Sequence, residues 1–174
     1  MSTPARRRWI LAGAGVAAAA AGAGWQLWRQ RLRPPAPADV LWPLRLTRPE
    51  GGELVMATLQ GRPLLLNFWA TWCPPCVKEM PEIDQFRPLL AARGGEVVGL
   101  AIDGPTPVRE FLQRVPVRFP IGLAGFEGTE LVKQLGNATG GLPFTVLFGA
   151  DGQVLQRKMG QTHLAELRSW LDLL

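Results

Sequence analysis

Cys73 and Cys76 are the two residues of this chain best placed to do chemistry, and they are its only cysteines. The residues between them, Pro74 and Pro75, favour the first turn of a helix, where a backbone N–H has no partner to lose. Since the N-terminal end of a helix carries partial positive charge, it stabilises a thiolate and lowers the pKa of Cys73. The pattern predicts a redox pair in which Cys73 attacks a disulfide and Cys76 resolves the mixed disulfide.

A strand before this pair and a helix after it must position the two thiols. The apolar run Leu64–Trp69 is typical of a buried strand. The helix is expected from Cys73 to about Ala92. Glu79 lies one turn beyond Cys76 on the same helical face. It would accept the Cys76 proton if burial raises its pKa, or it is a solvated carboxylate favoured by the helix start, and the spacing leaves both interpretations open.

The stretch from Asn67 to Cys76, Asn-Phe-Trp-Ala-Thr-Trp-Cys-Pro-Pro-Cys, resembles the thioredoxin superfamily. It is most similar to the membrane-tethered TlpA/ResA/CcmG-like thiol–disulfide oxidoreductases. Glu79 and Pro81 behind the motif, and Gly140-Gly141-Leu142-Pro143-Phe144-Thr145 far downstream, add to the likeness. The resemblance covers residues 44–174. It implies a thioredoxin-like three-layer α/β sandwich with a mixed central sheet and an N-terminal β-hairpin, preceded by a membrane helix.

The resemblance also implies roles for individual residues. Cys73 and Cys76 would form the redox-active disulfide, with the acid Glu79 near them. Pro143 would be cis and face the cysteines, and the residue before it would pair by its backbone with the substrate chain. Thioredoxins proper carry a buried aspartate where this chain has Asn67, so that proton route is absent here. The residues expected to bind substrate are Trp72, Pro74, Pro75, Leu142 and Pro143, and no cofactor or metal is expected.

Hydrophobic periodicity and turn residues predict the remaining elements. In chain order they are a β-hairpin of residues 44–47 and 53–58, a strand over 96–102, a helix from 106 or 107 to 114, a strand over 119–121, a helix over 127–135, a hairpin of 144–148 and 154–158, and a helix from 164. Thr106 would cap the helix that it precedes, and Pro81 would kink the helix after the cysteines. Strands that alternate with helices predict an α/β domain.

The positive charge of the chain is concentrated in its first 33 residues. They hold six arginines and no acid, whereas the remainder holds 13 basic and 14 acidic residues. The domain therefore has no basic surplus for nucleic acid, and no nucleic-acid partner is expected. Two cysteines and a single histidine, His163, exclude a multi-disulfide scaffold and a four-ligand structural zinc site.

The N-terminal residues have the pattern of an export segment. After a basic segment over 1–8, residues 9–28 are apolar and, as a helix of about 30 Å, long enough to span a bilayer core. The preceding arginines fit an uncleaved signal anchor with the basic segment in the cytoplasm. A cleaved signal peptide is the alternative. A Pro-rich linker over 29–43 would then lead to the domain over 44–174. Both interpretations place this domain in the periplasm, where an uncleaved anchor would hold it on the inner membrane and signal cleavage would release it as a soluble protein.

These features predict a membrane-tethered extracytoplasmic thiol–disulfide oxidoreductase. The resemblance implies a reductant of disulfide-containing periplasmic proteins, for example in cytochrome c maturation or copper-site assembly, recharged by a transmembrane electron donor. Two alternatives stay open. One is a disulfide-forming oxidase, which the Pro-Pro dipeptide does not exclude. The other is a copper- or haem-handling chaperone that uses both thiols without turnover.

Overall fold

The computed structural model describes Gly22, Trp25 and residues 36–174. The basic segment 1–8, the expected anchor 9–28 apart from those two residues, and the linker as far as residue 35 lie outside the described residues. The chain divides into two compact units, Met1–Pro35 and Ala36–Leu174. In the part of the chain that the structure describes, no helix combines the length and the apolar character needed to cross a bilayer.

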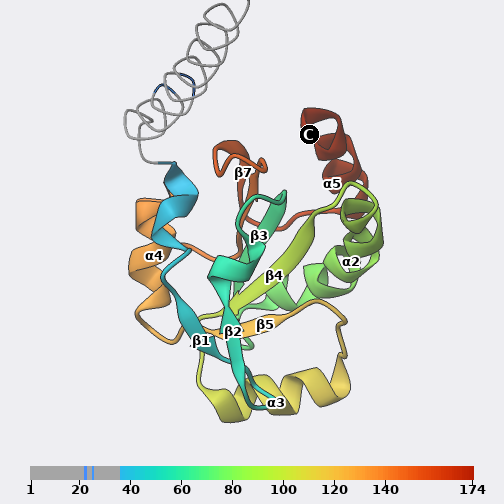
Figure 1. Ribbon diagram of the computed structural model, residues 1–174. Helices are drawn as coiled ribbons and strands as arrows, with labels where there is room; N and C mark the ends of the chain where they lie inside the picture. Colours follow the sequence, from blue (N-terminus) through green and yellow to red (C-terminus); the bar gives the residue numbers. More distant parts are fainter. Residues whose placement is uncertain (1–21, 23–24, 26–35) are drawn as a thin grey trace, which may run out of the picture. The chain divides into compact units, whose positions relative to one another are not determined.

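A five-stranded mixed sheet forms the centre of the second unit (Figure 1). Its strands are ordered β5 (Ile121–Leu123), β4 (Glu96–Ala101), β3 (Leu64–Trp69), β6 (Phe144–Phe148) and β7 (Val154–Met159). The first three run parallel, whereas β6 is antiparallel to β3 and β7 is antiparallel to β6. Every residue of the central strand β3 is buried, because both faces of the sheet are covered.

Helices on the two faces of the sheet complete the three layers. On one face, α2 (Pro74–Ala91), α3 (Pro105–Arg114) and α5 (Leu164–Trp170) contribute to a hydrophobic core. On the other face lie α4 (Gly128–Gln134) and the hairpin of β1 (Arg45–Thr47) and β2 (Glu53–Val55), followed by the 3-10 helix η2 (Met56–Leu59). Figure 1 shows α4 and α2 on opposite sides of the sheet. A short 3-10 helix η3 (Leu171–Leu173) ends the chain.

Side chains alternate along β3, and this alternation decides what faces the active-site helix. Leu65 and Trp69 belong to the core on the α2 side, whereas Leu64, Leu66 and Phe68 belong to the core on the α4 side. Asn67 shares the parity of Leu65 and Trp69, so its side chain is directed toward α2.

The expected elements are present, with shifted ends. Helix α3 begins at Pro105 with Gly104 as its N-cap and no side-chain hydrogen bond there, so the expected cap at Thr106 is wrong. Proline at the first helical position starts the helix earlier than the threonine. Strand β5 begins at Ile121 rather than at residue 119, after Pro120, which has no N–H for the ladder. Helix α2 runs through Pro81 as one helix.

The domain begins before residue 44. The 3-10 helix η1 (Pro37–Val40) places Ala38 in the core on the α4 side, and Leu41 beside it is also fully buried. The N–H of Ala38 donates to the carbonyl of Gly152 in the β6–β7 turn at 3.2 Å. Residues 36–43 therefore pack as part of the domain and are not a spacer. Their proline-rich composition carries no periodicity that would have predicted this packing.

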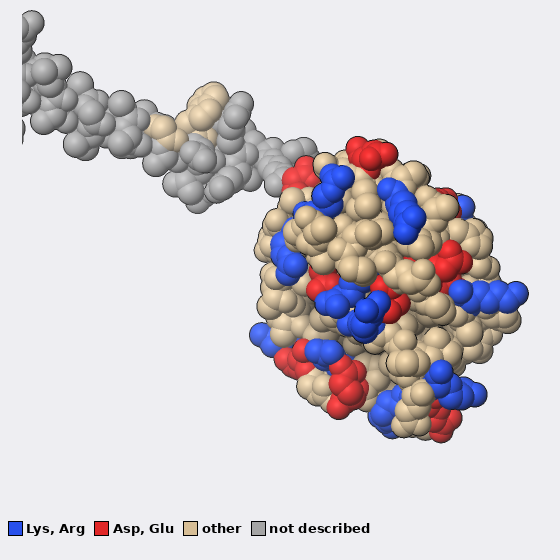
Figure 2. Space-filling view, turned by 90° about the vertical axis from the view of Figure 1, so that its right-hand side faces the viewer, with Lys and Arg blue, Asp and Glu red and all other residues tan. Residues whose placement is uncertain are grey.

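The surface charge of the second unit is mixed in sign. Figure 2 shows Lys and Arg side chains interspersed with Asp and Glu on the face that it presents. This distribution agrees with the near balance of basic and acidic residues beyond residue 33.

Candidate active site

Cys73 and Cys76 lie where β3 leads into α2, and they form a disulfide with a Cα–Cα distance of 5.3 Å. Cys73 is the N-cap of α2, and the N–H of Cys76 donates to its Sγ at 3.4 Å. In the reduced protein this geometry directs a helix N-terminal N–H at the Cys73 sulfur, which favours the thiolate. Cys73 retains 5% exposure whereas Cys76 has none, so a substrate disulfide reaches Cys73 first.

Glu79 is fully buried and hydrogen-bonded through both oxygens, so it is not the solvated carboxylate of the alternative interpretation. Its Oε1 accepts from Nδ2 of Asn67 at 2.7 Å. Its Oε2 accepts from the N–H of Thr162 at 2.7 Å and from the hydroxyl of Thr162 at 2.8 Å. Asn67 also donates to Oγ1 of Thr145, its direct cross-strand partner, at 3.0 Å. The network joins β3, α2, β6 and the loop before α5.

Burial raises the pKa of Glu79 above its ordinary value of 4.5, because the carboxylate loses its hydration. The hydrogen bonds from Thr162 and Asn67 oppose this rise without cancelling it, and the negative charge of Glu82 adds to it. A carboxyl group with a raised pKa, one helical turn from Cys76, is suited to exchange a proton with that thiol.

Asn67 can serve both protonation states of Glu79. In the described part of the chain, its Oδ1 is buried without a hydrogen-bond partner. A flip of the Asn67 side-chain amide exchanges the positions of Oδ1 and Nδ2. Oδ1 would then accept a hydrogen bond from a protonated Glu79.

Glu82, also on α2, holds the same loop as Glu79. Its Oε2 accepts from the N–H of Leu164 at 2.6 Å, and its Oε1 lies 3.1 Å from Nδ1 of His163. The hydrogen bond from Leu164, followed by the interactions with His163, lowers the pKa of Glu82. His163 is exposed and is the N-cap of α5. Two carboxylates of α2 thus clamp residues 162–164.

Asp103 holds the loop that leads from β3 to Cys73. Its Oδ2 accepts from the N–H of Thr71 at 3.1 Å and from the hydroxyl of Thr71 at 2.5 Å. Trp72 follows this anchored residue and is 63% exposed, whereas Trp69 is fully buried in the core. The structure therefore exposes the indole of Trp72 to water directly before Cys73 in the chain.

The peptide bond between Leu142 and Pro143 is cis and directly precedes β6. Pro143 is buried and Leu142 is half-buried. Since Phe144 pairs with Phe68 of β3, Pro143 lies at the sheet edge where β3 ends and the cysteines follow. The residues that the structure gathers along this edge and the α2 segment that follows it are Cys73, Cys76, Glu79, Trp72, Pro74, Pro75, Leu142 and Pro143.

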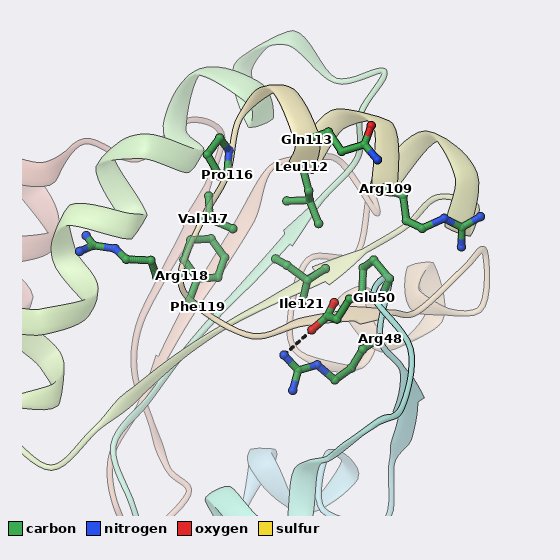
Figure 3. Close-up of a pocket in the computed structure, with 11 residues that line it drawn as sticks. Arg48, Glu50, Arg109, Leu112, Gln113, Pro116, Val117, Arg118, Phe119 and Ile121 are labelled. Atoms are coloured by element: carbon green, nitrogen blue, oxygen red, sulfur yellow. Dashed lines mark ion pairs between the residues drawn. The ribbon is translucent and has the colours of Figure 1, made fainter.

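A separate hollow of about 440 Å³ lies between α3 and the β1–β2 turn (Figure 3). Leu112, Phe119 and Ile121 line its apolar interior, and Arg109 and Arg118 lie at its rim. None of the residues predicted for the redox site lines it.

Comparisons with known proteins identify the family of this chain. A family profile described as Redoxin matches residues 35–171. The thiol-disulfide oxidoreductase ResA of Bacillus cereus is 31% identical over 124 residues, which cover 71% of this chain and 69% of that protein.

Solved structures share the fold. A thioredoxin-family thiol:disulfide interchange protein from Chlorobium tepidum TLS superposes with a TM-score of 0.67 at 25% identity, over 75% of this chain and 91% of that chain. A thioredoxin-related protein from Neisseria meningitidis serogroup B superposes with a TM-score of 0.65 at 30% identity, over 74% of this chain and 96% of that chain.

The fold, the disulfide at the start of α2 and these likenesses define a thioredoxin-fold thiol–disulfide oxidoreductase. The chain belongs to the Redoxin family and is of the TlpA/ResA/CcmG-like type within the thioredoxin superfamily.

Several residues around the site were not predicted from the sequence. Thr145 and Thr162 bind the Asn67–Glu79 pair, and Asp103 holds Thr71. Thr162 is 83 residues from Glu79 in the chain, and no local pattern links them. The sequence could have indicated a role for Thr145, because a polar residue inside the apolar strand Phe144–Phe148 needs a buried hydrogen-bond partner.

Proposed function

We propose that this protein reduces disulfides of exported proteins in the periplasm, and that residues 9–28 tether it to the inner membrane. The observation that carries the proposal is the Cys73–Cys76 disulfide at the N-terminus of α2, with the buried carboxyl group of Glu79 one turn behind it. Substrates in cytochrome c maturation or copper-site assembly are the classes that the resemblance implies. A transmembrane donor would return the protein to its dithiol form.

The reaction begins on the reduced protein. The thiolate of Cys73 attacks one sulfur of a substrate disulfide, the substrate S–S bond breaks, and the departing thiolate takes up a proton. The thiol of Cys76 then gives its proton to Glu79 and attacks the Cys73 sulfur. The Cys73–Cys76 bond forms as the mixed disulfide between Cys73 and the substrate breaks, and the second substrate sulfur leaves as a thiolate that takes up the proton held by Glu79. The substrate gains two electrons and two protons, and the protein becomes the disulfide that the structure contains.

The reduction potential tests the direction of electron flow. Equilibration with dithiol buffers should give a reduction potential in the range of reductants such as thioredoxin, about −270 mV. A value of about −120 mV, typical of strong oxidants, would show instead that the protein forms disulfides.

Trapping tests the substrate class and the compartment together. The Cys76→Ser variant keeps the attacking thiol and lacks the resolving one, so mixed disulfides should accumulate on Cys73 in cells. The trapped partners are expected to be exported cysteine-containing proteins in the membrane fraction. Recovery of cytoplasmic partners alone would overturn the proposed location. The double variant Cys73→Ser with Cys76→Ser is the matched control and should trap nothing.

A further inference from the structure

The hollow between α3 and the β1–β2 turn has the size and the interior of a small-molecule site. Its volume of about 440 Å³ falls within the range of roughly 300–1,000 Å³ that is usual for ligand pockets. Leu112, Val117, Phe119 and Ile121 make its interior apolar (Figure 3). Since apolar surface gains free energy when it leaves water, this interior favours a ligand with an apolar body.

Three arginines line the hollow, and two of them have an acidic partner. Arg48 forms an ion pair with Glu50, and Nε of Arg118 lies 3.0 Å from Oδ2 of Asp84 on α2. Arg109 of α3 forms no ion pair in the part of the chain that the structure describes. With both acids counted, one positive charge therefore remains at the hollow, and a ligand with a single negative charge would balance it.

A buried donor of the same hollow has no acceptor. Nε of Arg48 is buried and has no hydrogen-bond partner among the described residues. Native proteins leave few buried N–H groups unpaired, and a guanidinium N–H binds a carboxylate more strongly than it binds a neutral acceptor. Figure 3 shows Arg48 and Arg109 at one end of the hollow and Arg118 at the other. The end with Arg48 and Arg109 is therefore the one suited to an anionic group.

The floor of the hollow lies against the last residue of β3. A Cβ on Gly99 would lie 2.6 Å from Cδ1 of Ile121 and 2.9 Å from Cε2 of Phe119. The same Cβ would lie 3.2 Å from Nε1 of Trp69, so the indole is directly behind two residues of the lining. Its ring also packs against Phe111 of α3, with 5.2 Å between the ring centroids. The indole N–H of Trp69 can therefore report on a ligand that enters the hollow.

We propose that this hollow binds a small organic monoanion, an alkyl or aryl group that carries one carboxylate. The apolar group fills the interior at Leu112, Phe119 and Ile121. The carboxylate accepts a hydrogen bond from Nε of Arg48 and faces the charge of Arg109. None of the residues predicted for the redox site lines the hollow, so this is a second site that does not depend on the proposed function.

The experiment follows the tryptophan indole N–H resonances of the 15N-labelled full chain by NMR during titration. The probes are 4-phenylbutyrate and its neutral analogue 4-phenylbutanamide. The resonance of Trp69 is the one that the Trp69→Phe variant lacks. It should shift in a saturable way with the acid, with a Kd of about 1 mM or lower. The amide should bind about tenfold more weakly, because it forms no hydrogen bond as a charged group.

Two variants of α3 form a matched pair. Arg109→Gln removes the arginine that lines the hollow, and Arg114→Gln removes an equal charge from the same helix outside the lining. Arg109→Gln should raise the Kd of the acid about tenfold and leave that of the amide unchanged. Arg114→Gln should change neither. Both variants should reduce oxidised glutathione at the parent rate, which confirms that the fold and the redox pair are intact.

Two variants of the β1–β2 turn test the position of the carboxylate. Arg48→Lys keeps the positive charge and removes the guanidinium with its Nε, so the Kd of the acid should rise about tenfold. Glu50→Gln removes the carboxylate that lines the hollow at this end and should lower the Kd of the acid.

Equal affinities of the parent protein for the acid and the amide would overturn the inference. Equal weakening in Arg109→Gln and Arg114→Gln would do the same, because it would show attraction by the general charge of α3. A Trp69 resonance that stays in place while other indole resonances shift would locate the ligand elsewhere. Binding of acetyl-Phe-Asp amide at a Kd far below that of 4-phenylbutyrate would assign the hollow to an acidic protein partner instead.

Discussion

Replacement of Glu79 by Gln separates the chemistry of this carboxyl group from its part in the fold. The variant keeps the shape of the side chain. Its amide oxygen can accept from the N–H and hydroxyl of Thr162, as Oε2 does in the parent protein. Its amide nitrogen would face Asn67, whose unpartnered Oδ1 becomes the acceptor after half a turn of the Asn67 amide. The hydrogen bonds of residue 79 to Thr162 and to Asn67 can therefore be kept while the ionisable group is removed.

The expected effect on Cys76 follows from the separation of the two side chains. Residues three apart on a helix lie about 5–6 Å from each other. At an effective dielectric constant of about 20, an ionised Glu79 would oppose a thiolate at Cys76 by about 3 kcal/mol, or about two pKa units. The pKa of Cys76 should fall by as much as this amount in the variant. The resolving step should nevertheless slow by roughly a hundredfold, because its proton acceptor is lost.

The effect on stability has a definite sign. Because the pKa of Glu79 is raised in the folded protein, the folded state binds the proton more readily than the unfolded state. Stability contributed by this proton is lost as the pH rises through the folded pKa. The melting temperature of Glu79→Gln should therefore be equal to or higher than that of the parent protein at pH 8. The difference between the two melting temperatures should shrink as the pH falls toward 4.5, the ordinary pKa of the group.

Glu82→Gln is the matched control on the same helix. The pKa of Glu82 is lowered, so its stabilising effect is present above 4.5 and is lost as the pH falls through the folded pKa. This variant should melt lower than the parent protein at neutral pH. It should keep the rate of the resolving step and move its pH inflection only slightly downward, because the charge of Glu82 is the smallest cause of the raised pKa of Glu79. The assays are alkylation of Cys76 in a Cys73→Ser background and stopped-flow release of the mixed disulfide from pH 5 to 9. Unchanged profiles for Glu79→Gln would remove Glu79 from the mechanism.

Three further predictions concern the surroundings of the site. Thr162→Val removes one donor to Glu79, so the pKa of Glu79 should rise further and move the inflection of the resolving step to higher pH, and Thr162→Ser should restore it. A chain that starts at Ala36 should melt cooperatively, whereas one that starts at Leu44 lacks the buried Leu41 and should lose about 2–5 kcal/mol in urea unfolding. Gly99→Ala would place a Cβ 2.6 Å from Cδ1 of Ile121 and should lower the free energy of unfolding by about 1–3 kcal/mol, with unchanged exchange kinetics of the folded protein.

The sequence alone was sufficient for the redox pair and its framework. The apolar run before Cys73 and the prolines after it predict a strand and a helix start, and these are local properties of the chain. The strand Leu64–Trp69 has the expected bounds, and α2 begins directly after Cys73. Hydrophobic periodicity and turn residues are properties of neighbouring positions in the chain, so they can be recognised without knowledge of the tertiary structure.

Tertiary structure decided what surrounds the pair. Whether Glu79 faced water or the core could not be read from its place on α2, because the answer depends on Asn67 of β3 and Thr162 of a loop that is distant in sequence. The packing of Leu41 into the domain likewise depends on a surface formed by other strands. The hollow lined by Arg48, Arg109 and Ile121 joins a turn, a helix and a strand that are distant in sequence, and no local pattern encodes it. Period and capping act between neighbours in the chain, whereas burial and register depend on residues that only the folded chain brings together.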